Sequence, residues 1–576
     1  MPPLSSPRTA AAAALLGTAL TLAAAAAAEA TALAAPTAPA KTHGAKDGKS
    51  HGGKAGAKAR REDKKSVPSP GATATAKEGR AAGASAPKES APEPPREMPA
   101  LALDRVTLDN GLRVVMSPSS ASPTVAIAVT YDAGSRLEAR GQSGIARLLE
   151  RLMFQGSKNI GPGEHARLVE ERGGVATGTA DENDATFLDV LPAGELALGL
   201  FLEADRMKGL ALSEESLLQE REALERERQA RLSGLAFTPS ALRLRELVYQ
   251  GYFPYEHPAD GAMADLASLT LASIADIHAH RYGPGSAVLT ITGDFDPREA
   301  ESLVRRYFDG IPKSDVAPPD EAALPEQTSQ RTAVMRDPEA RAPAIFYGFA
   351  IPAASTREHH ALDLAAIMLG GGESSRLYQT LVRERAIAGR ASAETYGLRG
   401  PDLFSISVEL GEEAKVGDVE KLIEGEIKAL ATAGPSDAEI DKARRQMQSR
   451  ILLDMESSPR RAALLGAWES RYNDARMLER EIPAYLAVTR EDVKRATSQY
   501  LGPTRRSIVE AYPASTLLPK GDATAPKGAL AAPTSPGALA PTPPASPGTR
   551  KGGKASPEHK PKKGAPAKAK KPRKEG

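Results

Sequence analysis

The 576-residue sequence contains no cysteine, which excludes both disulfide bridges and a lipid anchor attached to a cysteine. Beyond its N-terminal segment, the chain also lacks any apolar run long enough to cross a membrane. These two absences predict a soluble protein once the N-terminal segment has been removed. A chain of this length exceeds one ordinary core, so it has room for two or three domains and additional disordered segments.

The N-terminal segment is rich in alanine and leucine. It runs from Arg8 through an apolar stretch to Ala32-Leu33-Ala34, which is the order of a charged region, an apolar region and a small-residue cleavage site. We interpret residues 1–34 as a secretory signal peptide, and this predicts a periplasmic or secreted protein. The alternative is an alanine-rich helix that stays on the protein or anchors it.

Charge is distributed unevenly along the chain. The formal net charge is +2, yet residues 31–98 carry 13 basic and 7 acidic side chains and residues 517–576 carry 13 basic and 3 acidic ones. The body between them, residues 99–516, has a net charge of −14. The two arms, residues 35–98 and 515–576, mix Ala, Pro, Gly and Lys without periodicity, so we expect them to be disordered. They act either as solubilising linkers or as contacts to an anionic surface, the cell envelope or nucleic acid.

The body shows alternating strand and helix signals. Short β-branched runs, such as residues 125–131 and 288–292, lie among amphipathic helical stretches, a pattern that predicts an α+β fold. Asn110-Gly111 lies between two extended runs, which indicates a β-hairpin and hence an antiparallel sheet at the start of the body.

One pattern occurs twice in the body. Residues 273–277, followed by Tyr-Gly-Pro at 282–284 and a strand, are matched by residues 489–493, followed by Tyr-Leu-Gly-Pro at 500–503 and a strand. This repetition predicts an internal duplication. We therefore expect a first lobe over residues 99–314, a linker rich in Pro, Ala and Glu over residues 315–332, and a second lobe over residues 333–514.

A helix after Ser143 carries the most informative motif. Its apolar face is formed by Ile145, Leu148, Leu149, Leu152 and Met153. Arg147, Glu150 and Arg151 share the opposite side, because they are spaced at i, i+3 and i+4. Considered alone, this is the pattern of an ordinary surface helix.

The segment resembles the signature helix of the insulinase (pitrilysin) family of zinc metallopeptidases, in particular its bacterial processing-peptidase-like branch. The family motif is H-x-x-E-H followed by Phe-x-Gly-Ser/Thr, and Phe154, Gly156 and Ser157 match the second part. The resemblance extends over residues 103–513. It implies two homologous α/β-sandwich lobes of the type found in mitochondrial processing peptidase.

The resemblance also assigns roles to the motif positions. Glu150 stands where the family has the general base that acts on zinc-bound water. Arg147 and Arg151 stand where the family has its two zinc-binding histidines, and a guanidinium group offers no lone pair to a metal. The resemblance places the third ligand at Glu227, which lies 76 residues after Arg151. We therefore expect no bound metal, or zinc only if the site is competent after all.

Two fixed cations in place of a divalent metal suggest a different use of the site. We hypothesise that Arg147, Arg151, Glu150 and Glu227 form an ion-pair cluster. The alternative is that residues 214–229 form an ordinary exposed, glutamate-rich helix.

The positions that contact substrate in the family are also altered. Thr177 stands where the family usually has an asparagine that contacts the substrate backbone. Arg383 matches the arginine of a substrate-orienting Arg/Tyr pair, but Arg390 stands where the tyrosine is expected and Tyr396 is only a distant substitute. Peptide binding through Thr177 and Arg383 is therefore an expectation based on the resemblance.

The histidines offer no other zincin-like motif. His278 and His280 lie two residues apart on a predicted helix and face different sides. His359-His360 adjoin a helix start and His165 opens another helix. We expect none of them to pair with a second ligand at i+4 in the manner of a zincin.

Three functions agree with these patterns. The leading one is an exported, catalytically inactive homologue, a pseudopeptidase, that pairs with an active subunit of the family as a heterodimer, forms a homodimer, or binds unfolded peptides. The second is an active zinc metalloendopeptidase with ligands elsewhere, in which Glu150 is the base and Glu227 one ligand. The third is a module that binds the cell envelope or nucleic acid through its basic arms.

Overall fold

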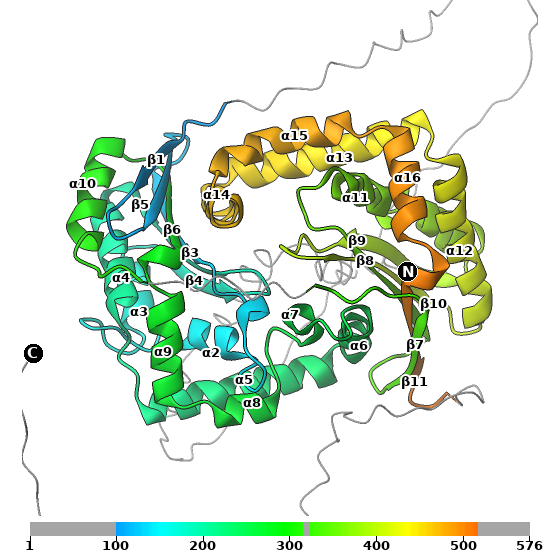
Figure 1. Ribbon diagram of the computed structural model, residues 1–576, viewed down its shortest axis with the longest axis horizontal. Helices are drawn as coiled ribbons and strands as arrows, with labels where there is room; N and C mark the ends of the chain where they lie inside the picture. Colours follow the sequence, from blue (N-terminus) through cyan, green and yellow to red (C-terminus); the bar gives the residue numbers. More distant parts are fainter. Residues whose placement is uncertain (1–99, 315–322, 517–576) are drawn as a thin grey trace, which may run out of the picture. The chain divides into compact units, whose positions relative to one another are not determined.

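The computed structural model describes residues 100–314 and 323–516, which all belong to one compact unit (Figure 1). The predicted signal peptide, nearly all of both arms and residues 315–322 of the predicted linker lie outside the described residues. No helix in the described ranges is sufficiently long and apolar to span a membrane.

Two mixed β-sheets form the frame of the body. The first has the strand order β1-β2-β6-β3-β5-β4, with β1 (Asp104–Thr107), β2 (Arg113–Pro118), β3 (Thr124–Tyr131), β4 (Val175–Ala180), β5 (Ala185–Pro192) and β6 (Ala287–Gly293). The second has the order β7-β11-β8-β10-β9, with β7 (Arg331–Asp337), β8 (Ala344–Ile351), β9 (Ala388–Thr395), β10 (Asp402–Leu410) and β11 (Arg506–Pro513). The predicted α+β fold is confirmed. β7 begins at Arg331, so the last two residues of the predicted linker belong to a strand.

The strand orders also confirm the internal duplication. When β1 is set aside, β2, β6, β3, β5 and β4 of the first sheet occupy the same places as β7, β11, β8, β10 and β9 of the second. In each sheet the first of these pairs is parallel and the other neighbours are antiparallel. The edge strands β4 and β9 are therefore equivalent.

The predicted hairpin joins β1 and β2, which pair antiparallel. Gly111 adopts a left-handed conformation with φ of 91°, which glycine tolerates without the steric cost of a side chain. Asn110 is buried, and its side-chain amide donates to the carbonyls of Phe308 and Ile311. The Asn-Gly turn therefore also attaches the hairpin to the end of a distant helix.

Helices cover both sheets. Those between β3 and β7 are α2 (Ile145–Leu152), α3 (Glu164–Glu170), α4 (Leu196–Lys208), α5 (Glu214–Gly234), α6 (Thr238–Val248), α7 (Phe253–Glu256), α8 (Met263–Ser268), α9 (Leu271–Arg281) and α10 (Pro297–Phe308). Those after β8 are α11 (Arg357–Gly370), the π-helix η4 (Tyr378–Glu384), α12 (Val416–Ala433), α13 (Asp437–Glu456), α14 (Ser458–Tyr472), α15 (Leu478–Ala487) and α16 (Arg490–Tyr500). Short 3₁₀ turns are η1 (Ser135–Leu137), η2 (Ala193–Glu195), η3 (Pro284–Ser286), η5 (Ala475–Met477) and η6 (Pro503–Arg505). Each sheet builds its own large apolar core with the helices on one face.

The second face of each sheet is covered by a helix from the other half of the chain. Leu244 of α6 packs with Phe346 of β8 in the second sheet, and Ala462 of α14 packs with Ala126 of β3 in the first. The contact of α14 is close, because a Cβ atom at Gly466 would lie 2.6 Å from Thr130 Oγ1. The two halves therefore exchange helices, and neither sheet has both faces covered without the other half.

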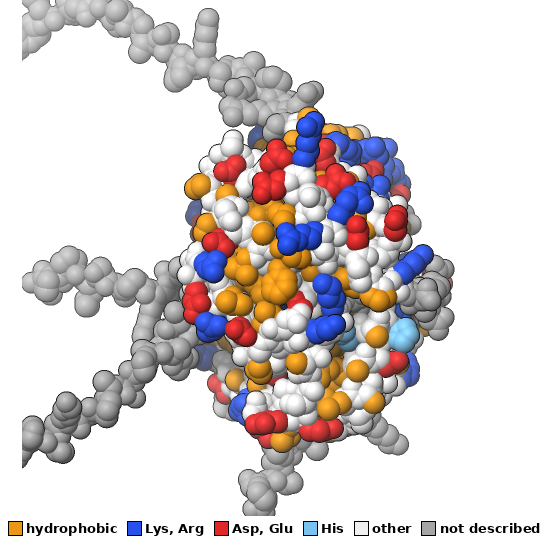
Figure 2. Space-filling model, turned by 90° about the vertical axis from the view of Figure 1, so that its left-hand side faces the viewer, with side chains coloured by type: hydrophobic (Ala, Val, Ile, Leu, Met, Phe, Trp, Pro, Cys, Tyr) orange, Lys and Arg blue, Asp and Glu red, His pale blue; other side chains and the backbone are white. Residues whose placement is uncertain are grey.

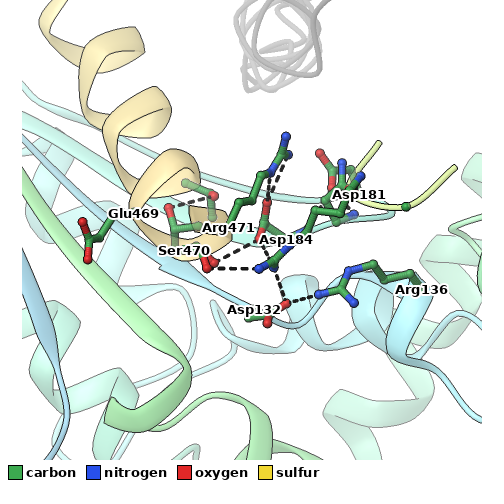
Figure 3. A network of polar contacts seen from close by, with 12 residues as sticks. Asp132, Arg136, Asp181, Asp184, Glu469, Ser470 and Arg471 are labelled. Atoms are coloured by element: carbon green, nitrogen blue, oxygen red, sulfur yellow. Dashed lines mark hydrogen bonds and ion pairs between the residues drawn. The ribbon is translucent and has the colours of Figure 1, made fainter. Parts of the chain in front are cut away.

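A partly buried polar network also joins the two halves (Figure 3). Arg399 from the second half pairs with Asp132 of the first at 2.7 Å, and Arg471 of α14 pairs with Asp184 at 3.2 Å. Burial, together with repulsion from Asp184, raises the pKa of neighbouring Asp181 to about 6. Ion pairs therefore hold the two halves together in addition to apolar packing.

The surface on the α10 side carries both signs of charge. Figure 2 shows acidic and basic side chains interspersed there around smaller apolar areas. The net negative charge of the body is therefore not gathered into a single field on this face.

Candidate functional site

The site is centred on α2, whose start is fixed by a buried carboxylate. Gly144, the residue before the helix, has a left-handed φ of 89°, and a Cβ atom there would lie 2.8 Å from the carbonyl oxygen of Asp260. Glu138 accepts from the backbone N–H groups of Gly144 and Ala146 at 2.8 and 2.9 Å, and His257 lies 2.9 Å from its carboxylate. Burial raises the pKa of Glu138, although these hydrogen bonds oppose the rise. The helix therefore begins at a fixed point, and its side chains have defined positions.

The predicted ion-pair cluster is present. Arg147 Nη1 donates to Glu150 Oε2 at 2.5 Å, and Arg147 Nη2 donates to Glu227 Oε1 at 3.1 Å. Arg151 Nη1 donates to the other oxygen of Glu227 at 3.2 Å. The single carboxylate of Glu227 on α5 therefore bridges the two arginines of α2, which the sequence resemblance equates with the family's histidines.

Glu220 is a further member of the cluster, which the sequence analysis did not identify. It accepts from Arg151 Nε at 2.7 Å and also accepts from the side-chain amide of Gln155. Glu220 and Glu227 are seven residues apart and therefore lie on the same face of α5. That spacing was a signal in the sequence. The structure also corrects the alternative of an ordinary exposed helix over residues 214–229, because α5 extends to Gly234 and Glu220 is buried against α2.

Glu150 has the most perturbed charge in the cluster. Its side chain is 10% exposed, and this burial raises its pKa to about 7, because nearby Arg147 and Arg151 only partly compensate the lost hydration. For Arg147 the balance is reversed. Burial acts to lower its pKa, but Glu150 and Glu227 outweigh that effect and raise it. Arg147 therefore stays charged, whereas Glu150 is about half protonated near pH 7.

These residues do not fit a zinc ion. Zinc is bound by thiolate, imidazole or carboxylate atoms that carry a free lone pair. Of the three predicted ligand positions only Glu227 supplies such an atom, and both of its oxygens already accept from guanidinium groups. The two cations next to it would also repel a divalent metal.

One other group of potential metal ligands occurs in the part of the chain that the structure describes. Ligand atoms of His165 in α3, Asp189 in β5 and Glu203 in α4 lie within 4.8 Å of one another. All three are buried, and His165 Nε2 lies 3.0 Å from Asp189. Arg206 pairs with Glu203 and lies over the ring of Phe187, 4.4 Å from its centre. A buried cation is therefore already present, so this group is a poorer metal site than its residue types suggest.

His359 has two carboxylate partners, but they are not arranged as a zincin motif. Its Nδ1 lies 3.1 Å from Asp363 at i+4, and its Nε2 lies 2.7 Å from Asp402. Burial acts to lower the pKa of His359, but the two carboxylates outweigh it and raise the pKa to about 10. Both ring nitrogens are occupied by carboxylates, so this is a buried ion-pair group rather than a zincin motif. His278 is buried and His280 exposed, as expected for opposite faces of α9.

The two expected substrate contacts lie in different lobes. Thr177 is partly buried on the edge strand β4, and the next residue, Gly178, lies against the ring of Phe154. Arg383 lies in the π-helix η4, where its side chain is 62% exposed and 3.5 Å from Glu373. Arg390, in β9, lies 3.8 Å from Glu409. No hydrogen bond or ion pair among the described residues connects Arg383 to the α2–α5 cluster.

The duplicated sheets, together with the resemblance of α2 to the inverted zincin motif, indicate a two-lobed protein with the insulinase-like fold. Residues 113–237 match the family model described as insulinase (peptidase family M16), and residues 268–447 match the model described as peptidase M16 inactive domain. The chain belongs to the insulinase family. The second match begins in α8 and therefore includes β6, which belongs to the first sheet. The two family models thus do not divide the chain at the boundary between its sheets.

Similar proteins include several with protease names. The zinc protease PqqE of Helicobacter pylori is 28% identical over 409 residues, which cover 70% of this chain and 92% of that protein. A solved protease structure from Helicobacter pylori has a TM-score of 0.68 and 27% identity, covering 72% of this chain and 100% of the other. The periplasmic protease PqqL from Escherichia coli has a TM-score of 0.60 and 16% identity, covering 72% of this chain and 48% of the other. This last likeness shows the fold alone.

Proposed function

We propose that this chain is an exported, catalytically inactive member of the insulinase family, which pairs with a competent subunit of the family or holds peptides without cleaving them. The observation that carries the proposal is the bridge from Glu227 to Arg147 and Arg151. This bridge fills the positions at which the family binds its metal. Glu150 remains at the position of the base, but it is hydrogen-bonded to Arg147 and has no metal-bound water on which to act.

Peptide binding does not require the metal. β4 is the last strand of its sheet, so its outer edge has no neighbouring strand within the sheet. An extended peptide can add to such an edge through main-chain hydrogen bonds. Thr177 lies on this strand, and its side chain is the one that we expect to contact the peptide backbone. Arg383, from the second lobe, is the other residue proposed to contact a peptide, because it is exposed and its nearest carboxylate is 3.5 Å away.

Export is the part of the proposal that rests on residues 1–34. Their pattern of charge, apolar stretch and small residues supports removal after Ala34. Sequencing the N-terminus of the protein recovered from the periplasmic or extracellular fraction of the native bacterium tests this. An intact N-terminus in the membrane fraction would instead support an anchor.

The decisive experiment measures metal content and cleavage together. The purified mature protein is subjected to elemental analysis and incubated with an unstructured polypeptide such as casein, with and without a chelator. We expect no stoichiometric zinc and no chelator-sensitive cleavage. Stoichiometric zinc with chelator-sensitive cleavage would overturn the proposal.

The group formed by His165, Asp189 and Glu203 gives the active-enzyme alternative a specific location. If zinc is found, His165→Gln separates the two places where it could bind. Loss of zinc in this variant would assign the metal to that group, whereas unchanged zinc would place it at the α2–α5 site, where Glu227→Gln should then remove it.

The pairing part is tested with a catalytic insulinase-family subunit encoded by the same genome. We expect the two chains to co-elute, and the mixture to cleave a peptide with a lower KM than the catalytic subunit alone. A catalytic subunit that is fully active alone and unaffected by this chain would leave peptide holding as the function.

A further inference from the structure

A basic groove runs along the exposed side of α13. It has a volume of about 550 Å³ and is lined by Lys442, Arg445, Gln446, Ser449, Arg450, Leu453 and Asp454 of α13, with Arg460 from the start of α14. We call it the α13 groove. It belongs to the second lobe and includes no residue of the α2–α5 cluster.

The α13 groove is a continuous stripe on a firmly held helix. Its lining residues on α13 recur every three or four residues along the helix, so they lie on one face. Together they extend over about three turns, roughly 18 Å. The other face of α13, with Ile440, Ala443 and Met447, is buried in the second core. The groove therefore keeps its shape without a ligand.

The charge of the groove is opposite to that of the body. Four cations line it and only one carboxylate, that of Asp454, which lies 3.0 Å from Arg460. Lys442 donates to the carbonyl of Ser374 at 2.9 Å. For Arg445 no ion pair is found among the described residues. On the face shown in Figure 2, by contrast, the two signs are mixed.

An exposed apolar side chain lies within this stripe. Leu453 is 61% exposed, which makes it the most exposed large hydrophobic residue in the described ranges. It sits one turn beyond Arg450 on the same face. A cationic stripe with an apolar position at one end is complementary to a segment that carries carboxylates beside an apolar side chain.

We propose that the α13 groove binds a short acidic peptide segment that contains an apolar anchor for Leu453. About 18 Å accommodates roughly five or six extended residues, so the stripe matches the length of a short segment. The arms of this chain are excluded as ligands by their charge, since both have an excess of basic residues. Nucleic acid fits poorly, because the stripe offers no aromatic side chain for stacking and contains Asp454.

The test uses the full-length mature protein and a fluorescein-labelled peptide of alternating glutamate and leucine, with binding followed by fluorescence anisotropy at physiological ionic strength. The variant is Arg445→Glu/Leu453→Ser. The matched control is Arg226→Glu/Leu218→Ser on α5, whose residues are also exposed and whose net charge change is the same. The basic arms contribute equally to both proteins, so the difference between them reports the groove.

We expect the α13 variant to bind the peptide about tenfold more weakly than the wild type, and the α5 control to stay within about twofold. Both variants should keep the wild-type thermal midpoint, because all four side chains are exposed. Equal weakening in both variants, or binding of single-stranded DNA with the same dependence on Arg445 and Leu453, would overturn the proposal. This outcome is independent of the metal and cleavage measurements, because no residue is shared with the α2–α5 cluster.

Discussion

Replacing Glu150 by glutamine should remove a pH-dependent loss of stability. The pKa of Glu150 in the folded protein is about 7, above its ordinary value of 4.5, and the main cause is burial. The unfolded chain therefore loses this proton at lower pH than the native state does. As the pH rises from about 4.5 through 7, the buried carboxylate increasingly opposes folding.

The size of the effect follows from the two pKa values. Between pH 5 and pH 8 this single group should lower the free energy of unfolding by roughly 2–3 kcal/mol in the wild type, and Glu150→Gln should lack that loss. The stability of Glu150→Gln relative to the wild type should therefore increase with pH by about that amount. Under the proposed function, Glu150 takes no part in catalysis, so its substitution is expected to act through stability alone.

The assay is urea denaturation of both proteins at pH 5, 6, 7 and 8, followed by circular dichroism. The matched control is Glu225→Gln, since Glu225 is an exposed glutamate of α5, and its stability relative to the wild type should stay within about 0.5 kcal/mol at every pH. If Glu150→Gln and the wild type show parallel pH dependence, the carboxylate is better solvated or better paired than the structure indicates, and the reasoning about the cluster fails.

Three further variants test other parts of the structure. Arg147→His/Arg151→His places imidazoles at both family ligand positions, so elemental analysis should find zinc in this variant and none in the wild type. His359→Gln leaves buried carboxylates without their cation and should lower the unfolding free energy by about 3–5 kcal/mol at neutral pH, as measured by urea denaturation. Because the pKa of His359 is raised to about 10, the wild type should lose this contribution as the pH rises from about 6.5 through 10. Gly466→Val forces α14 away from Thr130, and a fall in unfolding free energy of about 1–3 kcal/mol should accompany it, seen as a lower thermal midpoint. An unchanged midpoint would mean that α14 does not pack closely on the first sheet.

The α2–α5 cluster could be predicted from helical spacing combined with the family resemblance. Helical spacing placed Arg147, Glu150 and Arg151 on one side of α2, and the resemblance supplied the distant partner Glu227. The opposite charges of the arginines and the glutamates then favoured ion pairs between them. Glu220 was overlooked although its spacing of seven residues from Glu227 was visible, since the resemblance gave it no role. The ion pair of His359 with Asp363 was not predicted either, because the positions at i+4 were considered only as partners in a zincin-type metal motif.

The exchange of helices between the lobes could not be predicted from the sequence. Amphipathic periodicity indicates that α6 and α14 each bury one face, but it does not specify which sheet covers that face. Both helices follow the core-forming helices of their own half, so the simplest expectation is packing within that half. Small residues at the contacts, Gly348 and Gly466, allow the close approach. In a sequence, however, an isolated glycine in a strand is equally typical of a bulge or a tight bend.

The two arginines explain how the site helices can stay connected without the zinc ion that joins them in the family. In the family a zinc ion joins the two site helices, and loss of its histidines would leave Glu227 and Glu150 as unpaired carboxylates close together. Arginine is suited to this position, because its planar group forms several hydrogen bonds and stays charged even when partly buried. Arg147 and Arg151 each contact Glu227 and one further glutamate, and three of these four ion pairs connect α2 to α5. These ion pairs therefore hold the two site helices in place beside the edge strand β4.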